Sequence, residues 1–425
     1  MNSLDGAACT GSRGSTETAA AAAVRRLSAG VVALLAVCCA ASVANVYYAQ
    51  PLLDAIAHDF GISHAEVGGV ITATQLGCAL ALLFVVPLGD LLNRRRLIAV
   101  QLALLVAACA GVAAAASPLA LLAGMVGVGL LGTAMTQGLI AYAATLAGDG
   151  ERGRVVGAAQ GGVVIGLLMA RSLAGLVTDL AGWRAVYLAS GLFAIAMLIV
   201  LSRWLPAPPA GRAPSKTHEP LGYGRLLRSM GTLLLHERVL QVRGMLGLLM
   251  FASFSVFWSA LVLPLGAPPF SMSHTAIGAF GLVGALGALA AARAGRLTDR
   301  GLGQATTGVA LLLLLAAWLP IALMGTSIWL LIVGIVLLDI GGQAIHVVNQ
   351  GLIFSTRPEA HARLVGCYML FYSVGSGLGA IGATTAYAHA GWPGVCMLGA
   401  ALSLAALVFW VATRRLVPAD GGRAR

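Results

Sequence analysis

A polar stripe interrupts one of the most apolar segments of the chain. Its members follow one another at intervals of three or four residues, so they share one face of a helix. They are Asp339, Gln343, His346 and Gln350. A carboxylate in the middle of a membrane segment costs a few kcal/mol, so it normally faces a protein interior or a wet cavity and marks a substrate or proton pathway. The stripe is therefore the leading candidate for a functional site.

Asp339 is predicted to carry protons. In low-dielectric surroundings a carboxylate can take up a proton from one side of a membrane and release it on the other after the molecule inverts. His346 either relays that proton or hydrogen-bonds a neighbour, and the sequence leaves both alternatives open. Gln343 and Gln350 are predicted to contact substrate.

Arg171 is a second charge inside an apolar segment, opposite in sign to Asp339. At about 1.5 Å per residue it lies roughly 24 Å into its helix, too deep to reach the nearer headgroups easily. It pairs with Asp339, binds an anionic group on substrate, or reaches the farther headgroups. We include it with Asp339 and His346 in the predicted proton-coupling set.

The composition places the whole chain in a membrane. Hydrophobic residues make up 59% and charged residues 10% of 425, which excludes an ordinary soluble domain. The 55 glycines fit helices that pack closely in lipid. The seven cysteines form no CxxC pair or metal-ligand spacing, so no metal and no cofactor is predicted. A net charge of +11 comes mostly from Arg beside apolar segments, which indicates topology rather than nucleic-acid binding.

Twelve apolar segments are long enough to cross a bilayer, at roughly 20 residues per crossing. Basic residues gather on alternate connections, which places both termini in the cytoplasm, and we expect a cell (bacterial inner) membrane. The fold class is therefore an all-α polytopic membrane protein. The segments are 29–50, 67–88, 97–116, 119–146, 155–180, 186–205, 245–265, 277–297, 305–323, 328–353, 364–387 and 395–411.

The two halves of the chain are copies of each other. One constant offset maps Asp90 onto Asp299 and Trp183 onto Trp392, each at the same end of its helix. Two parallel six-helix repeats are typical of a rocker-type transporter with substrate bound near the midplane. The predicted parts are a disordered tail (1–24), a first bundle (25–205), a cytoplasmic linker with a basic amphipathic helix (206–243), a second bundle (244–415) and a tail (416–425).

Local motifs resemble the major facilitator superfamily, and its twelve-helix drug:proton antiporter branch in particular. Residues 87–96, PLGDLLNRRR, are similar to the Gly-x-x-x-Asp-Arg-x-Gly-Arg-Arg loop of that family, although Leu91 replaces its first Arg. The pattern returns after the eighth segment. The resemblance implies a conformational latch at the cytoplasmic ends of the helices. Its predicted members are Asp90, Arg94, Arg95, Asp299 and Arg300.

The fifth segment resembles the antiporter signature. Gly157, Gly166 and Gly175 match its glycine spacing, and Arg171 stands where the family has Pro. In this family helices one, four, seven and ten line the central cavity. The resemblance therefore implies substrate contacts from Asn45, Tyr48, Gln137 and Trp258.

These patterns predict a secondary transporter that works by alternating access and couples proton movement to efflux of a small molecule, such as a drug, sugar or metabolite. The alternatives are a proton-coupled importer and a non-transporting membrane sensor on the same scaffold. No GxSxG, HExxH or P-loop motif indicates an enzyme. The expected partners are a substrate, protons and lipid, with no nucleic acid, and the expected state is a monomer.

Overall fold

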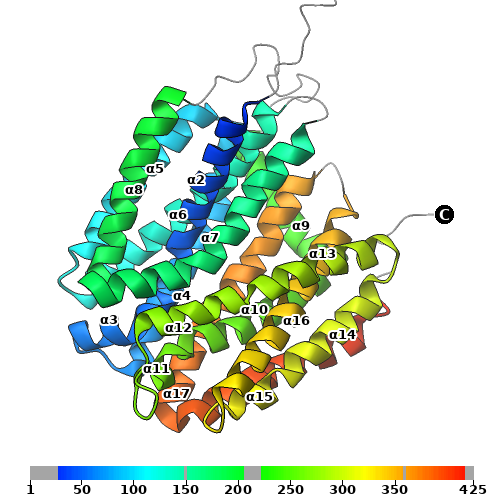
Figure 1. The fold of residues 1–425 in the computed structure, drawn as a ribbon. Helices are drawn as coiled ribbons and strands as arrows, with labels where there is room; N and C mark the ends of the chain where they lie inside the picture. The colour runs from blue at the N-terminus through cyan, green and yellow to red at the C-terminus, as the bar shows by residue number, and fades with distance from the viewer. Residues whose placement is uncertain (1–26, 148–150, 205–221, 358–359, 417–425) are drawn as a thin grey trace, which may run out of the picture.

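The computed structural model describes residues 27–147, 151–204, 222–357 and 360–416. Within these ranges every regular element is a helix. Figure 1 shows two helical bundles side by side, with α2 and α5 to α8 in one and α13 to α16 in the other. The Pro-rich part of the predicted linker and both predicted tails lie almost entirely outside the described residues.

The first bundle begins where short polar side chains cap its helices. Ser63 and Glu66 form a capping box at the start of α4, and Asn93 accepts from two amide groups at the start of α5. The elements are α2 (Ala29–Tyr47), η1 (Gln50–Leu52), α3 (Leu53–Phe60), α4 (His64–Leu80), η2 (Ala81–Val85), η3 (Val86–Asp90), α5 (Arg94–Ala113), α6 (Pro118–Leu146), α7 (Arg152–Ala181) and α8 (Trp183–Trp204).

Two features of the second bundle depart from one helix per predicted crossing. The eighth crossing is divided at Gly284 into α12 and α13, and α17 bends at Gly391, whose φ is 60°. With that bend, the eleven apolar helices of the described residues give the twelve predicted crossings. The elements are α9 (Tyr223–His236), α10 (Arg238–Ala260), α11 (Val262–Gly266), α12 (His274–Val283), α13 (Ala285–Asp299), α14 (Gly303–Ala316), α15 (Trp318–Ala322), α16 (Ile328–Phe354) and α17 (His361–Thr413).

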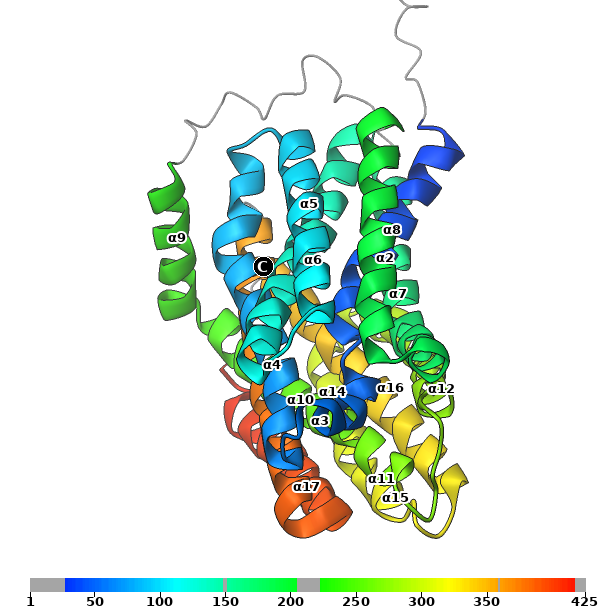
Figure 2. The ribbon, with the colours of Figure 1, turned by 90° about the vertical axis from the view of Figure 1, so that its left-hand side faces the viewer.

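The two ends of the molecule differ in charge. Arg94 and Arg152 begin α5 and α7, and Arg300 follows α13, so we call this end the basic end. Figure 2 shows α3, α11 and α15 at the other end, remote from the undescribed segments, and we call it the opposite end.

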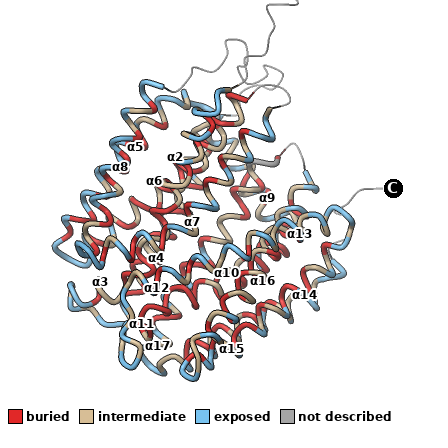
Figure 3. The backbone as a smooth tube through the Cα atoms, viewed as in Figure 1, coloured by how far each residue is buried: buried red, intermediate tan, exposed pale blue. Residues whose placement is uncertain are grey.

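Figure 3 shows exposed residues along α5, α8 and α14, and many exposed side chains of the helices are large and apolar. Leu180 is 77% exposed, Leu319 70% and Trp329 72%. Such a surface is unsuited to water and is what a lipid-embedded bundle presents. The protein is therefore an integral membrane protein.

The amphipathic helix predicted after the Pro-rich segment is α9. Its apolar face does not lie only toward lipid, because Met230 and Leu233 pack in a cluster with Leu364 and Tyr368 of α17. At its start the Tyr223 hydroxyl donates to the Phe84 carbonyl at 2.8 Å, so α9 contacts both bundles.

The two bundles meet along two helix pairs, α4 with α17 and α7 with α12. Thr72 donates to the Gly377 carbonyl at 2.8 Å, and Ser172 donates to the Gly278 carbonyl at 3.0 Å. Both contacts lie in the parts of these helices nearer the opposite end. Small residues allow this close approach of backbones.

Candidate functional site

A cavity of about 440 Å³ lies between the bundles. Residues 160–168 of α7 and 343–350 of α16 contribute to it, so it occupies the part of the seam nearer the basic end. Among its described lining residues there is no Asp, Glu, Lys or Arg. Its polar and aromatic lining consists of Tyr47, Thr133, Thr136, Gln137, Gln160, Phe251, Gln343, His346, Gln350, Tyr372 and Ser373.

Three members of the predicted polar stripe line this cavity together: Gln343, His346 and Gln350. His346 Nδ1 lies 3.1 Å from the Tyr368 hydroxyl, and its Nε2 lies 3.3 Å from Gln350 Nε2. Hydrogen bonds on two sides thus hold the His346 ring in place.

Asp339, the fourth member, lies just behind the cavity wall. It is 3% exposed, and its Oδ2 has no hydrogen-bond partner. A methyl group placed on Gly284 would come within 3.0 Å of that oxygen, and Gly284 lines the cavity. Gly284, at the α12–α13 break, therefore lies next to both the carboxylate and the cavity.

Arg171 is buried at the same seam, 4% exposed, and does not reach either surface. Its Nε donates to Gln50 Oε1 at 2.7 Å, and its guanidinium carbon lies 4.0 Å from the centre of the Trp258 ring. Its Nη2 has no partner. In the described structure Arg171 and Asp339 do not form an ion pair with each other. They are nevertheless close enough to attract each other electrostatically.

A pair of tyrosines closes the cavity on the side of Arg171. The hydroxyls of Tyr47 in α2 and Tyr372 in α17 are hydrogen-bonded to each other across the two bundles. The guanidinium of Arg171 lies 5.4 Å from the centre of the Tyr47 ring. Arg171 therefore lies behind this pair rather than in the cavity.

The residues implied by the family resemblance divide into three groups. Gln137 lines the cavity, whereas Trp258 contacts Arg171 and not the cavity. Asn45 faces α8, where Ser190 donates to its Oδ1 at 2.8 Å, and Tyr48 packs against the hydrophobic core. The face of α2 toward the seam carries Tyr47 instead, so neither Asn45 nor Tyr48 enters the proposed site.

The predicted latch residues are at the basic end. Arg94 donates to the carbonyls of Gly89 and Ala141 at 2.8 and 2.9 Å, which joins the loop to α6. Arg95 donates to the Ser202 carbonyl of α8 at 2.5 Å. Asp299 and Arg300 are exposed, and the side chain of Asp90 is outside the described part of the structure.

The opposite end is closed by a cluster that the sequence does not reveal. His274, which begins α12, lies 3.1 Å from Asp54 of α3 and 3.0 Å from Asp179 of α7. Asp179 also accepts from the amide and hydroxyl of Thr275, at 2.8 and 2.6 Å. A carboxylate of one bundle thereby caps a helix of the other.

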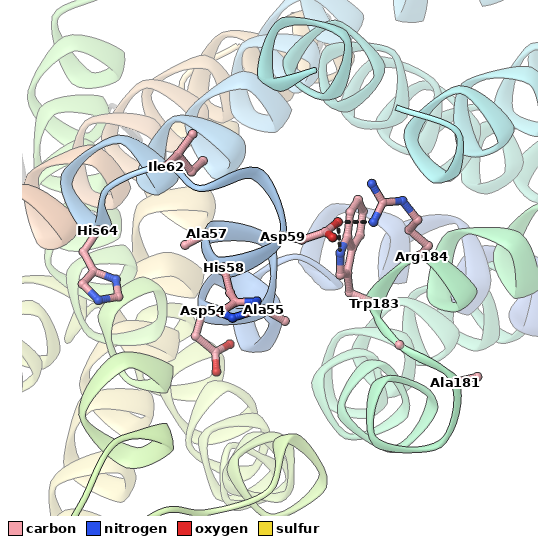
Figure 4. A pocket seen from close by; sticks show the side chains of 11 residues that line it. Asp54, Ala55, Ala57, His58, Asp59, Ile62, His64, Ala181, Trp183 and Arg184 are labelled. Carbon is pink, nitrogen blue, oxygen red and sulfur yellow. Dashed lines mark hydrogen bonds and ion pairs between the residues drawn. The ribbon is translucent and has the colours of Figure 1, made fainter. Parts of the chain in front are cut away.

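A larger depression of about 910 Å³ lies beside this cluster, between α3 and the α7–α8 junction. Figure 4 shows Asp59 there, bonded to Trp183 and Arg184. The Arg184 guanidinium, as the main cause, holds the pKa of Asp59 below its usual range. All three residues belong to the first bundle, so this contact stays within one half.

Sequence reasoning missed Gln50, Gln160 and Phe251 as site residues. Gln50 precedes Pro51 and lies beyond the end of α2, so no helical spacing links it to Arg171. Phe251 and Tyr372 are aromatic residues in apolar segments, and such residues usually pack against other helices. Only the tertiary structure brings their ring centres to within 4.3 Å of each other.

Comparisons with known proteins agree with the fold. A family model described as Major Facilitator Superfamily matches residues 32–303 and 244–425. The putative uncharacterized transporter YgaY of Escherichia coli is 42% identical over 90% of this chain and 95% of its own length. The probable transporter SCO4007 of Streptomyces coelicolor is 33% identical over 87% and 84%.

Among solved structures, the fold is similar to a bacterial homolog of the human lysosomal transporter Spinster in an inward-facing and occupied conformation. The TM-score is 0.74 and the identity 16%, over 91% of this chain and 96% of that one.

Proposed function

This chain belongs to the major facilitator superfamily, and on that premise we propose that it is a proton-coupled exporter of a small molecule that works by alternating access. Membrane transport itself follows from the family. The proposal concerns the direction of transport, its coupling to protons and the residues that form the site.

The proposal rests mainly on the burial of Asp339, whose Oδ2 has no hydrogen-bond partner. An ionised carboxylate with an unpartnered oxygen is costly to bury, and taking up a proton removes most of that cost. Asp339 lies on the seam between two bundles that must separate on one side and close on the other. A proton bound there can therefore be received from one side and released toward the other.

Arg171 supplies the balancing charge. While Asp339 is ionised, the attraction of Arg171 offsets part of its burial, and when Asp339 is protonated the seam carries one uncompensated positive charge. The charge of the seam thus differs between the two protonation states. We assign Asp339 and Arg171 to proton coupling, with His346 fixing the cavity wall beside them.

The direction rests on orientation. Positive residues favour the cytoplasmic side, so the basic end and both termini are assigned to the cytoplasm. The cavity lies toward the basic end and the contacts that close the seam lie toward the opposite end, which is the arrangement in which an exporter loads substrate from the cytoplasm. We assign closure of the basic end in the other state to Asp90, Arg94, Arg95, Asp299 and Arg300, because acidic and basic side chains at one end can form charge-assisted hydrogen bonds with each other.

The test uses inside-out vesicles that hold an acid interior and a pH-sensitive dye. Addition of uridine or methyl glucoside should release protons from vesicles containing the wild-type protein, and Asp339→Asn should reduce the signal to that of empty vesicles. Glu66→Gln is the control, because Glu66 is an exposed capping residue and glutamine keeps the cap. A normal signal from Asp339→Asn contradicts the coupling assignment, and co-movement of substrate and protons in one direction contradicts export.

A further inference from the structure

We propose that the cavity selects an uncharged ring compound rich in hydroxyl and amide groups. This inference rests on the proposed transport function and names the substrate class of the same cavity.

The charge of the cavity lining excludes ions. The described lining holds no Asp, Glu, Lys or Arg, and the ring of its one histidine, His346, is already held by Tyr368 and Gln350. Arg171 lies behind the tyrosine pair, and Asp339 lies behind Gly284. An ion that entered would lose its hydration without directly contacting an opposite charge, which is unfavourable.

The hydrogen-bonding groups of the cavity favour a neutral polar molecule. Gln137, Gln160 and Gln343 each present an amide, and in the described part of the chain none of these amides has a hydrogen-bond partner. Each amide offers two donor hydrogens and one acceptor oxygen. Amides and hydroxyls on a substrate match both kinds of group, and hydrocarbons match neither.

The aromatic wall favours a planar ring. Phe251 meets Tyr372 edge-to-face, with ring centres 4.3 Å apart, and meets His346 at 5.2 Å. Rings in such a cluster pack well against a further ring at the same kind of distance. The cavity volume of about 440 Å³ is in the range of sites for small ligands.

Three probes with one ring system and different charges test the assignment. Uridine is neutral, uridine monophosphate is anionic, and 5′-amino-5′-deoxyuridine is cationic. Thermal stabilisation of the purified full-length protein should require at least about tenfold less uridine than either charged analogue. No stabilisation by uridine, or equal or greater stabilisation by a charged analogue, overturns the assignment.

Two variants locate the binding. Gln343→Leu and Gln160→Leu should each weaken uridine binding about tenfold, which corresponds to the loss of one or two hydrogen bonds. Gln160 is on an exposed part of α7, so its replacement leaves the fold intact. Gln241→Leu, at the junction of α9 and α10 and outside the cavity lining, is the matched control and should bind uridine as wild type does. Unchanged binding by both cavity variants contradicts this site.

These results are separable from the proposed coupling. Uridine binding without proton release in vesicles refutes proton coupling and leaves the substrate class standing. Proton release driven by a charged compound supports proton coupling and contradicts the neutral substrate class.

Discussion

At the scale of single residues, Arg171 shows how a buried cation is held without an ion pair. Its Nε donates to the Gln50 amide oxygen and its guanidinium carbon lies over the Trp258 ring, 4.0 Å from the ring centre, while Nη2 has no partner. A guanidinium stacked on an indole out of water gains roughly 2 kcal/mol, and an ammonium group on a flexible stem lacks that flat face.

Arg171→Lys should therefore lower stability by about 1–2 kcal/mol although the charge is kept. The measurement is thermal unfolding in detergent, followed by tryptophan fluorescence. Arg203→Lys, at the exposed end of α8, is the matched control and should change almost nothing. An equal effect of the two substitutions would show that the stacking on Trp258 contributes no stability.

The sequence predicts part of this site and not the rest. Helical periodicity places Gln343, His346 and Gln350 on one face, and the structure brings them to one cavity. Spacing along a helix does not say which helix that face meets, so neither the electrostatic proximity of Arg171 to Asp339 nor the orientation of Asn45 toward Ser190 is predictable from it.

At the scale of elements, the break between α12 and α13 divides one predicted crossing into two helices with different neighbours. The α12 segment packs against α7 of the first bundle, and α13 packs against α16 of the second. A methyl group on Gly281 would lie 3.3 Å from Arg171 Cδ on one side of the break, and one on Gly284 would lie 3.0 Å from Asp339 Oδ2 at the break itself. A hydropathy profile shows a single apolar segment here, because a glycine lowers helix propensity but does not shorten the run of apolar residues.

Gly284→Ala should slow transport. Its methyl group would lie 3.0 Å from Asp339 Oδ2 and 3.1 Å from the Gly281 carbonyl oxygen, which forces one of them to move. Overpacking of this kind costs about 1 kcal/mol or more, or roughly a fivefold lower rate if the strain acts in the transition between states.

The readout for Gly284→Ala is the initial rate of uridine-driven proton release in inside-out vesicles. Gly295→Ala on α13 is the control, since the nearest atom to its methyl group would be Val347 Cγ1 at 3.6 Å. Equal rates for the two variants would mean that the contact between Gly284 and Asp339 has no part in the transport cycle.

At the scale of the whole molecule, the number of crossings is predictable and the conformation is not. Backbone polar groups must be satisfied within the lipid, so apolar length alone fixes the spans. Which ends of the two bundles touch depends on side-chain contacts of a few residues that are far apart in sequence. The closed end seen here is held by Asp54, Asp179 and His274, which come from three separate elements.

Asp179→Ala should shift the molecule toward a state that is open at the opposite end. The substitution leaves the amide groups of His274 and Thr275 at the start of α12 without their side-chain acceptor, while Ser273 still accepts from Ala276. Loss of these charge-assisted bonds, at about 1–3 kcal/mol, changes the ratio of the two states by roughly tenfold. Asp59→Ala is the matched control, because Asp59 is an acidic residue at the same end that bonds only within the first bundle, to Trp183 and Arg184.

Spin-label distances report this shift at both ends. Labels at positions 119 and 329 lie at the starts of α6 and α16, at the opposite end, and labels at 96 and 300 lie at the basic end. The six cysteines in the described part of the chain are buried, so only Cys9 needs replacement before labelling. In Asp179→Ala the 119–329 distance should lengthen while the 96–300 distance shortens, because alternating access opens one end as it closes the other. If Asp59→Ala moves both distances equally, or if Asp179→Ala moves neither, the cluster around His274 does not hold the two bundles closed.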